Sequence, residues 1–298
     1  MLTEGERPLN GSLAPLRAPP YVRRVMLTPL ASTVLLRVVA GAALSALVAL
    51  LARRAGSLSR SGATAAVFVG TAAVSAGWTW GALLLAYFVA SSALSRLGRA
   101  KKERRTSGVV AKGGNRDARQ VLANGGAFAL GTLLVTLAPG VAGSASLAAL
   151  GALAAATADT WATEVGTLVG GTPRSLLTAR PVPPGTSGGV SLAGSVAMIA
   201  GALFVALVAA ALGITRDVAL LALVTLAGTV GALGDSIIGA TMQERRWCDA
   251  CARATERRVH DCGATTRLAG GREWMDNDVV NLAATLIGAA VAAALYRG

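Results

Sequence analysis

Residues 143–163 read GSASLAALGALAAATADTWAT and contain one charged residue, Asp159, close to the end of the run. As an α-helix this stretch would be about 31 Å long, which is enough to cross the hydrocarbon core of a bilayer, about 30 Å thick. A carboxylate inside such a helix costs about 2.5–3.5 kcal/mol on insertion scales. The stretch therefore predicts a membrane-spanning helix with a functional aspartate near one end.

The rest of the chain follows the same pattern. Of its 298 residues, 53% are hydrophobic and 14% are charged, against roughly 25% charged in soluble domains, which argues against a soluble enzyme. The long apolar runs lie at about 30–52, 62–77, 79–97, 120–138, 143–163, 190–212, 217–242 and 277–296. We expect an all-α polytopic membrane bundle of about eight transmembrane helices, or seven if the short second run does not cross. Residues 1–29 are expected to be a flexible tail, and 30–298 one integral-membrane domain.

The basic residues predict the orientation, because Lys and Arg concentrate in cytoplasmic loops. The net charge is +13, and 21 of the 28 basic residues lie in four loops: 53–60, 96–119, 164–189 and 243–276. These loops are expected on the cytoplasmic side of the cell inner membrane, with both termini outside. Four arginines before the first helix disagree with that placement. We interpret the positive charge as determining the orientation in the membrane and attracting the protein to the lipid bilayer. No nucleic acid is expected as a partner.

Polar side chains gather at the cytoplasmic ends of four predicted helices. They are Arg116, Gln120 and Asn124 on one helix, Asp159 on the next, Asp235 on a third, and Asp276, Asn277, Asp278 and Asn281 at the start of the last. Carboxylate and amide oxygens suit Mg²⁺. Glu164 lies about 140° around the helix from Asp159, so both could bind one metal only if the helix loosens. The alternative is that such groups form interhelical hydrogen bonds, above all Asn124 and Thr285.

Two glycine-containing loops carry groups that suit phosphate. Residues 183–191, Pro-Pro-Gly-Thr-Ser-Gly-Gly-Val-Ser, lead into a helix N-terminus with hydroxyls and exposed backbone N–H groups. Lys112 and Arg116 flank a Gly-Gly turn. The alternative interpretation of 183–191 is a flexible connector. A Walker A loop is excluded, because no Gly-Lys-Ser/Thr follows the required spacing.

All three cysteines and the only histidine lie in the loop 243–276: Cys248, Cys251, His260 and Cys262. Such a Cys-x-x-Cys and His-x-Cys pair could hold a tetrahedral structural Zn²⁺. The alternatives are unbound or redox-active thiols and a catalytic zinc. A cytoplasmic location disfavours a lasting disulfide.

Five motifs in this order resemble a known family of integral membrane proteins, filed as domain of unknown function ninety-two. The motifs are Lys112–Gly114 with Gln120–Gly125, Ala158–Gly166, Val182–Ser191, Gly234–Ser236 with Gly239–Thr241, and Asn277–Asn281. The resemblance covers about residues 30–296. Ala158 stands where much of the family has Gly, and many relatives vary or lack the Cys/His loop.

The resemblance implies a function, because the family includes the plastid phytyl-phosphate kinase and is distantly similar to CTP-dependent polyprenol and dolichol kinases. It implies a Mg²⁺-dependent phosphotransferase that moves a phosphoryl group from a nucleoside triphosphate, with CTP favoured, onto a prenyl monophosphate such as phytyl or geranylgeranyl phosphate. The alternatives are a small-solute or ion transporter and another nucleotide-dependent lipid phosphotransferase.

The site residues expected for this reaction fall into three groups. The catalytic residues are Asp159, Asp235, Lys112 and Arg116; the nucleotide- or phosphate-binding residues are Arg180, Gly185, Thr186, Ser187, Gly188, Gly189, Asn124, Asn277 and Asn281; and the Mg²⁺ ligands are Asp159, Glu164, Asp235 and Asp278.

Overall fold

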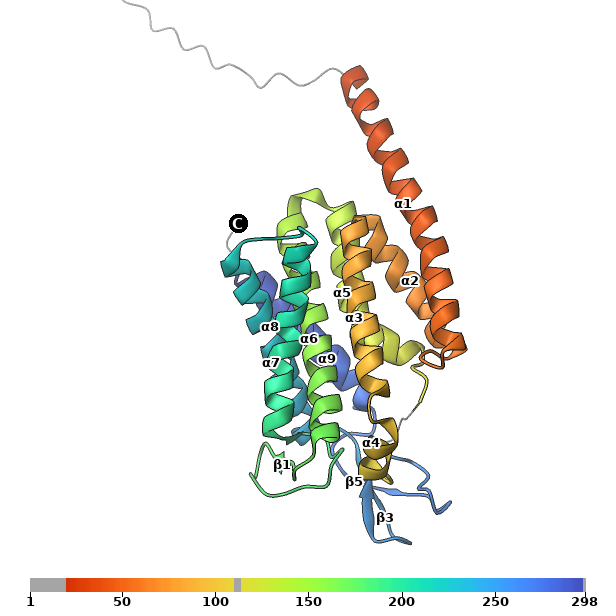
Figure 1. Ribbon diagram of the computed structural model, residues 1–298, viewed down its shortest axis with the longest axis vertical. Coiled ribbons are helices and arrows are strands. Elements are labelled where there is room, and N and C mark those ends of the chain that lie inside the picture. The colour runs from red at the N-terminus through yellow and green to blue at the C-terminus, as the bar shows by residue number, and fades with distance from the viewer. Residues whose placement is uncertain (1–19, 110–113, 297–298) are drawn as a thin grey trace, which may run out of the picture.

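The structure, a computed structural model, describes residues 20–109 and 114–296, with only the backbone for residues 20–31. Apart from one short helix that continues in the direction of the helix before it, the helices alternate in direction along the chain (Figure 1). They are α1 (Pro20–Arg54), α2 (Arg60–Ala76), α3 (Trp78–Arg96), α4 (Arg99–Thr106), α5 (Ala118–Leu137), α6 (Ala142–Val169), α7 (Leu192–Ala211), α8 (Val218–Thr241) and α9 (Asn277–Ala294), with a 3₁₀ turn at Pro139–Val141.

Every apolar run identified in the sequence forms a helix. Seven helices of the described chain are long and apolar enough to cross a membrane, and α2 falls just short of that length with 17 residues. The protein is therefore the predicted all-α membrane bundle. The first helix begins at Pro20, ten residues before the predicted end of the tail. The prediction rests on the apolar run, which indicates the part of a helix that lies in hydrocarbon and not the residue at which the helix begins. Proline is well suited to the first helical position.

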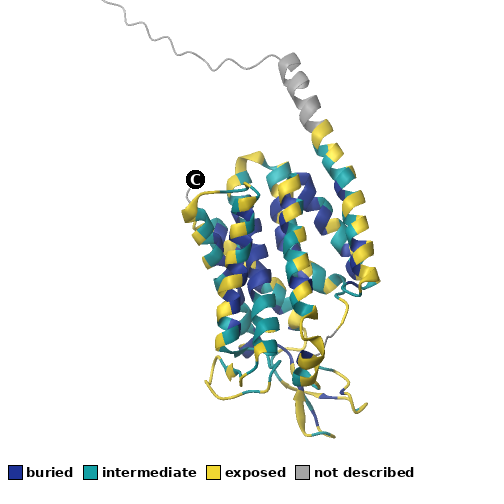
Figure 2. Cartoon of the chain, in the orientation of Figure 1, coloured by how far each residue is buried: buried dark blue, intermediate teal, exposed yellow. Residues whose placement is uncertain are grey.

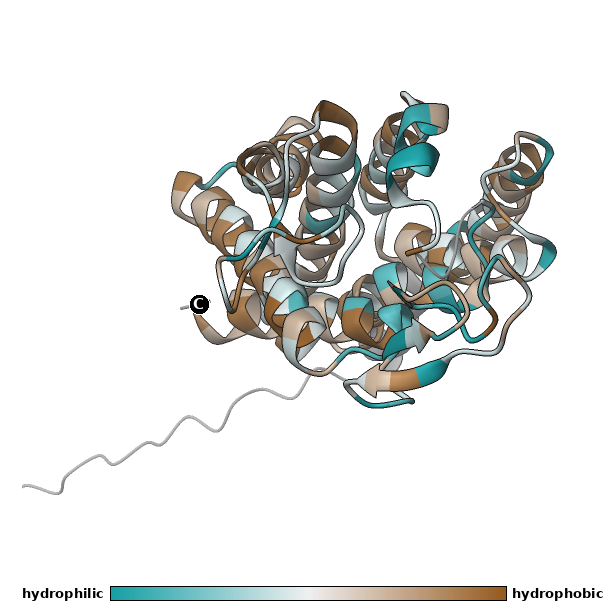
Figure 3. Ribbon diagram, turned by 90° about the horizontal axis from the view of Figure 1, so that it is seen from below, coloured by the Kyte–Doolittle hydropathy of each residue, from teal (hydrophilic) through white to brown (hydrophobic). Residues whose placement is uncertain are grey.

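One end of the bundle carries the long connections. The short helix α4, the segment 170–191 and the segment 242–276 gather there, and the C-terminal end of α9 lies at the opposite end (Figure 1). We call this the loop end. Seen from it, hydrophilic segments concentrate in the connections and the long helices are mainly apolar (Figure 3). The basic loops predicted for one face of the membrane thus lie on one side.

Small residues form the centre of the bundle. Helix α6 is almost fully buried from Ala149 to Ala158, and Figure 2 shows the buried residues following α6 and its neighbours. A Cβ on Gly288 of α9 would lie 2.6 Å from the Gly151 carbonyl of α6. Leucines such as Leu36 and Leu192 instead point outward. This is the distribution expected in lipid, where small residues permit close helix contact and acyl chains solvate large apolar side chains.

The connections contain short strands that the sequence did not indicate. Strands β1 (Arg174–Ser175) and β2 (Gly189–Val190) pair antiparallel. Strands β3 (Arg245–Cys248), β4 (Arg253–Thr255) and β5 (Arg267–Gly270) form an antiparallel sheet with β3 in the middle. We call residues 242–276 the β3–β5 module. Its buried Arg246 forms an ion pair with Glu244 and donates to Thr266 Oγ1 at 2.8 Å.

The contact between α6 and α9 predicts a selective sensitivity to added volume. Gly288→Ala places a methyl group 2.8 Å from the Ala155 Cβ as well as against Gly151, and it should lower the free energy of unfolding by about 1–3 kcal/mol, as overpacking does. Gly126→Ala on α5 is the control, because a Cβ there would meet nothing within 4 Å. Thermal unfolding in detergent would compare the two; equal midpoints would contradict close α6–α9 packing.

Candidate functional site

A cavity of about 400 Å³ opens among the helix ends at the loop end. Its walls come from the first turns of α5, α7 and α9, the last turns of α6 and α8, and the segment 184–191. Thirteen residues predicted for the site line it: Arg116, Asn124, Asp159, Glu164, Gly185, Thr186, Ser187, Gly188, Gly189, Asp235, Asn277, Asp278 and Asn281. Segments up to 175 residues apart in the sequence, from Thr106 to Asn281, therefore meet at one cavity.

Two half-buried aspartates from neighbouring helices form one wall. Asp159 lies on α6 and Asp235 on α8, and both side chains line the cavity. When the side-chain amide of Asn281 on α9 is oriented so that both its oxygen and its nitrogen have suitable partners, the nitrogen donates to Asp235 Oδ2 at 3.0 Å. The helices approach closely because Gly228 of α8 faces Ala154 of α6. Carboxylate and amide oxygens from three helices thus share a site, a donor set that fits Mg²⁺.

The start of α9 joins this wall to α5. Asp276 caps the helix by accepting a hydrogen bond from the Val279 amide at 3.1 Å. Arg119 of α5 forms an ion pair with Asp276 at 2.9 Å and lies 3.8 Å from Asp278 Oδ2. Thr285 donates to the Ala123 carbonyl at 3.0 Å, so the interhelical alternative considered for Thr285 holds. These contacts fix how the acidic start of α9 faces the cavity.

Glu164 has a different set of partners from the one predicted. It forms an ion pair with Lys102 of α4 and accepts a hydrogen bond from Ser95 Oγ at 2.5 Å, so each oxygen has a partner. Lys102 is 7% exposed and also donates to the carbonyls of Leu94 and Ser95. A carboxylate balancing a buried ammonium is poorly placed to bind Mg²⁺ as well. The position of Glu164 on the helix, away from Asp159, is the physical reason, and we assign it to the α4–α6 contact.

Arg116 lies beside this ion pair. Its guanidinium donates to Ser92 Oγ at 3.2 Å and to Ser95 Oγ at 3.1 Å, and it lines the cavity. Asp117 and Gln120 form a reciprocal capping box at the start of α5. The cap and the two serines hold the guanidinium in place, so the cavity lining includes a fixed cation as well as acidic groups.

The segment 185–189 is a tight turn held from two sides. Gly188 has a φ of +71°, and a Cβ there would lie 2.7 Å from the Ala240 Cα of α8. Ser187 is hydrogen-bonded to the buried Gln243, whose Nε2 donates to Glu256 Oε1 at 3.0 Å. These contacts exclude the flexible-connector interpretation, because both a helix end and the β3–β5 module hold the turn.

Of the two remaining predicted residues, one is not described by the structure and the other does not line the cavity. Lys112 lies outside the described residues. Arg180 is exposed and does not line the cavity, because its segment doubles back: the Ser175 amide donates to the Arg180 carbonyl at 2.9 Å, and β1 pairs with β2. Closeness in sequence to the 185–189 turn was therefore misleading for Arg180.

The cavity also includes residues that the sequence did not single out. Gln243, Glu244 and Glu256 line it from the β3–β5 module. They lie in irregular backbone next to short strands of a polar connection, where no helical period marks one face. The only available signal was the position of Gln243 directly after α8.

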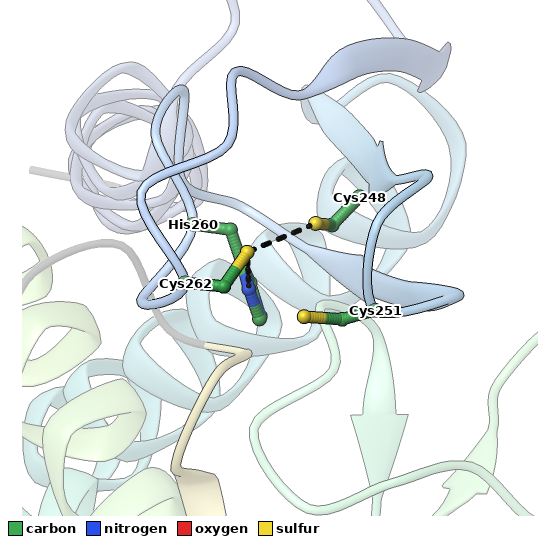
Figure 4. A group of neighbouring side chains, drawn as sticks. All are labelled: Cys248, Cys251, His260 and Cys262. Atoms are coloured by element: carbon green, nitrogen blue, oxygen red, sulfur yellow. Dashed lines mark hydrogen bonds between the residues drawn. The ribbon is translucent and has the colours of Figure 1, made fainter.

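The side chains of Cys248, Cys251, His260 and Cys262 converge (Figure 4), and their ligand atoms lie within 4.8 Å of one another. Cys248 Sγ is 3.6 Å and His260 Nδ1 is 3.3 Å from Cys262 Sγ. A hydrogen bond with the Ala264 backbone, followed by one with His260, lowers the pKa of Cys262 to about 6. Hydrogen bonding to Cys262 is the main cause that raises the pKa of Cys251 to about 11.

The fold and the cavity define an integral-membrane helical protein with a polar, acidic cavity at one end of its bundle. Residues 43–289 match the family model described as Integral membrane protein DUF92, and the chain belongs to this family. The family predicted from the sequence motifs is therefore confirmed.

Three relatives span most of the chain. It is similar to Protein PGR of Arabidopsis thaliana, with 34% identity over 84% of this chain and 93% of that protein. It is 32% identical to Protein VTE6, chloroplastic, of the same plant, over 79% of this chain and 64% of that protein. It is 30% identical to the uncharacterized membrane protein sll0875 of Synechocystis, over 72% and 73%. No solved structure matches the chain.

The Lys102–Glu164 ion pair predicts how the stability of a single variant should differ from that of a double variant. Glu164→Gln leaves the Lys102 ammonium buried without its countercharge and should lower the free energy of unfolding by about 3 kcal/mol, the lower limit for breaking a buried pair, since Glu164 is partly exposed. The double variant Lys102→Met/Glu164→Gln removes both charges and should be more stable than Glu164→Gln. Thermal melts in detergent would measure this; a double variant less stable than both single variants would contradict the pairing.

Proposed function

We propose that this protein is a membrane-embedded phosphotransferase that moves a phosphoryl group from a nucleoside triphosphate, CTP in preference to ATP, to a prenyl monophosphate such as phytyl or geranylgeranyl phosphate. The observation that carries the proposal is the convergence of Asp159, Asp235, Arg116 and the 185–189 turn on one cavity at the membrane surface. The loop end would face the cytoplasm, in agreement with its basic loops.

The acidic wall would bind the metal ion that such chemistry uses. Asp159 and Asp235 would hold Mg²⁺, with Asp278 close by, and Asn281 would orient Asp235 through its hydrogen bond. The ion, when bound, would neutralise charge on the nucleotide phosphates and on the transferring group. Arg116, held by Ser92 and Ser95, is suited to contact phosphoryl oxygens in the same cavity.

The 185–189 turn is suited to the nucleotide phosphates. Gly185 and Gly188 have φ angles of +87° and +71°, a conformation in which successive backbone N–H groups can form an anion-binding concavity. Ser191 caps α7 immediately afterwards by accepting a hydrogen bond from the Gly194 amide at 3.2 Å. The positive end of the α7 dipole adds to the attraction for phosphate.

The acceptor class is supported by the mixed lining of the cavity. Met198, Ala232 and Leu233 line it beside the polar groups, and Leu233 is partly exposed. An amphipathic substrate could place its phosphate among the polar groups and its chain along these apolar residues.

The reaction needs no strong base. A monophosphate oxygen of the acceptor, already ionised near pH 7, attacks the γ-phosphorus. A new P–O bond forms as the bond from the γ-phosphorus to the β–γ bridging oxygen breaks, which leaves a prenyl diphosphate and a nucleoside diphosphate. This suits a cavity whose lining contains no histidine among the described residues.

A transfer assay tests the proposal. Purified protein is incubated with geranylgeranyl phosphate, Mg²⁺ and labelled CTP or ATP, and labelled diphosphate is measured. Asp159→Asn and Asp235→Asn should each lower the rate about a hundredfold or more, because each removes a carboxylate that would hold the Mg²⁺ ion at the transferring group. Asp217→Asn is the control: Asp217 caps α8 outside the cavity lining, and Asn caps equally well.

Two results would contradict the kinase proposal. One is the absence of transfer to any prenol or prenyl phosphate together with uptake of a solute into proteoliposomes, which would identify a transporter. The other is transfer that proceeds at the wild-type rate in both aspartate variants, which would place the reaction outside this cavity.

The 185–189 turn gives a second, independent prediction. Gly188→Ala forces a methyl group against the α8 backbone and should move the turn, with at least about a tenfold loss of transfer and a higher KM for the nucleotide. Gly171→Ala is matched to it, because Gly171 also has a positive φ, +89°, but a Cβ there meets nothing within 4 Å. Steady-state kinetics distinguish the two; equal losses in both variants would indicate general backbone strain and contradict a specific role of the turn.

A further inference from the structure

We propose that Cys248, Cys251, His260 and Cys262 bind one Zn²⁺ ion, and that this ion holds the β3–β5 module in the shape that supports the 185–189 turn. The proposed zinc site is independent of the phosphotransferase chemistry. Only its effect on transfer rests on the proposed function.

The arrangement of donors fits tetrahedral zinc. Ligands at the usual Zn–S distance of 2.3 Å are roughly 3.8 Å apart in a tetrahedron, and Cys248 Sγ and Cys262 Sγ are 3.6 Å apart. His260 points Nδ1 toward the same centre, and Cys251 closes the fourth side (Figure 4). Three sulfurs and one nitrogen are a usual set for a structural zinc, because no position is left open for water.

The local backbone presents these donors from two tight turns. Cys248 ends β3, and Cys251 follows in the turn to β4, where Ala252 has a φ of +49°. His260 and Cys262 lie in a second turn, closed by the His260 amide donating to the Ala264 carbonyl at 3.0 Å. Two turns that each supply two ligands three or two residues apart are the arrangement expected for a metal that staples a small fold.

The module has few other means of holding together. Cys248 and Met275 are its buried apolar side chains, and its other buried side chains, including Arg246 and Thr266, are polar. The Nε2 of the buried His260 has no hydrogen-bond partner in the described residues. Folding such a segment without a core requires a strong local interaction, and metal binding to preformed thiolate and imidazole ligands supplies one.

Hydrogen bonds connect the β3–β5 module to the lining of the cavity. Its first residue after the α8 cap, Gln243, bonds to both Ser187 of the turn and Glu256 of the module. The Glu256 amide also donates to the Val109 carbonyl at 2.8 Å, just after α4. The segment between Cys251 and His260 is therefore joined through Gln243 to the 185–189 turn, and the proposed zinc ligands Cys251 and His260 lie at its two ends.

Zinc content and thiol count test the site without any activity assay. Metal analysis of the full-length protein purified without added zinc should give about one Zn²⁺ per chain. Cys251→Ser and Cys262→Ser should retain about a tenth or less, whereas His260→Cys, which restores four thiolates, should retain the ion. Asp249→Asn is the matched control, because Asp249 lies between Cys248 and Cys251 but its carboxylate pairs with the exposed Arg267.

Limited trypsin digestion tests the effect on the module, which contains seven of the chain's arginines. Chelation of zinc should speed cleavage within 242–276 about tenfold or more, and adding Zn²⁺ should reverse this. The rate of phosphoryl transfer should fall in parallel with the fraction of protein in which the β3–β5 module is uncleaved. A protein without zinc, or with a Cys248–Cys262 disulfide by thiol counting, would overturn the proposal. A zinc-loaded protein without transfer activity would instead contradict only the proposed function.

Discussion

Backbone-to-backbone contact at α6 is the constraint on which the rest of the bundle depends. In lipid there is no hydrophobic driving force for helix association. Association therefore relies on close packing and on hydrogen bonds between helices. Helix α6 meets α8 and α9 through alanine and glycine, with Gly151, Gly228 and Gly288 at the nearest approaches. Because these helices are so close, their polar ends face one another across a single cavity, and Asp159 and Asp235 become parts of one wall.

The polar groups at the loop end satisfy one another before any ligand arrives. Lys102 balances Glu164, Asn281 contacts Asp235, and Gln243 connects the 185–189 turn with the β3–β5 module. Such networks are stable at low dielectric only when most members are paired. The cavity is therefore a preorganised polar site whose walls are fixed by contacts outside it, as the proposed phosphoryl transfer would require.

Sequence patterns were informative wherever the type of a single residue indicates the environment in which it must lie. An aspartate in an apolar run must be held by the protein, so Asp159 and Asp235 could be identified, and a glycine-containing turn before a helix identified 185–189. Pairing between segments could not be read in the same way. Lys102 looks like any lysine of a basic loop, and Arg180 lies five residues from Gly185 yet turns away. Gln243 and the short strands around it follow no helical or alternating period, so their contact with Ser187 became visible only in three dimensions.

The shortness of α2 has a consequence for how the chain enters a membrane. Its 17 residues span about 25 Å, less than the hydrocarbon core of about 30 Å. A segment of this length partitions poorly alone, and it is separated from α3 by Gly77 only. Insertion of α2 therefore depends on α3 as the second arm of a helical hairpin, and on α1 and α5, against which it packs. A segment shorter than the hydrocarbon core is accommodated by local thinning of the bilayer or by association with other helices, and α2 has such helices on both sides.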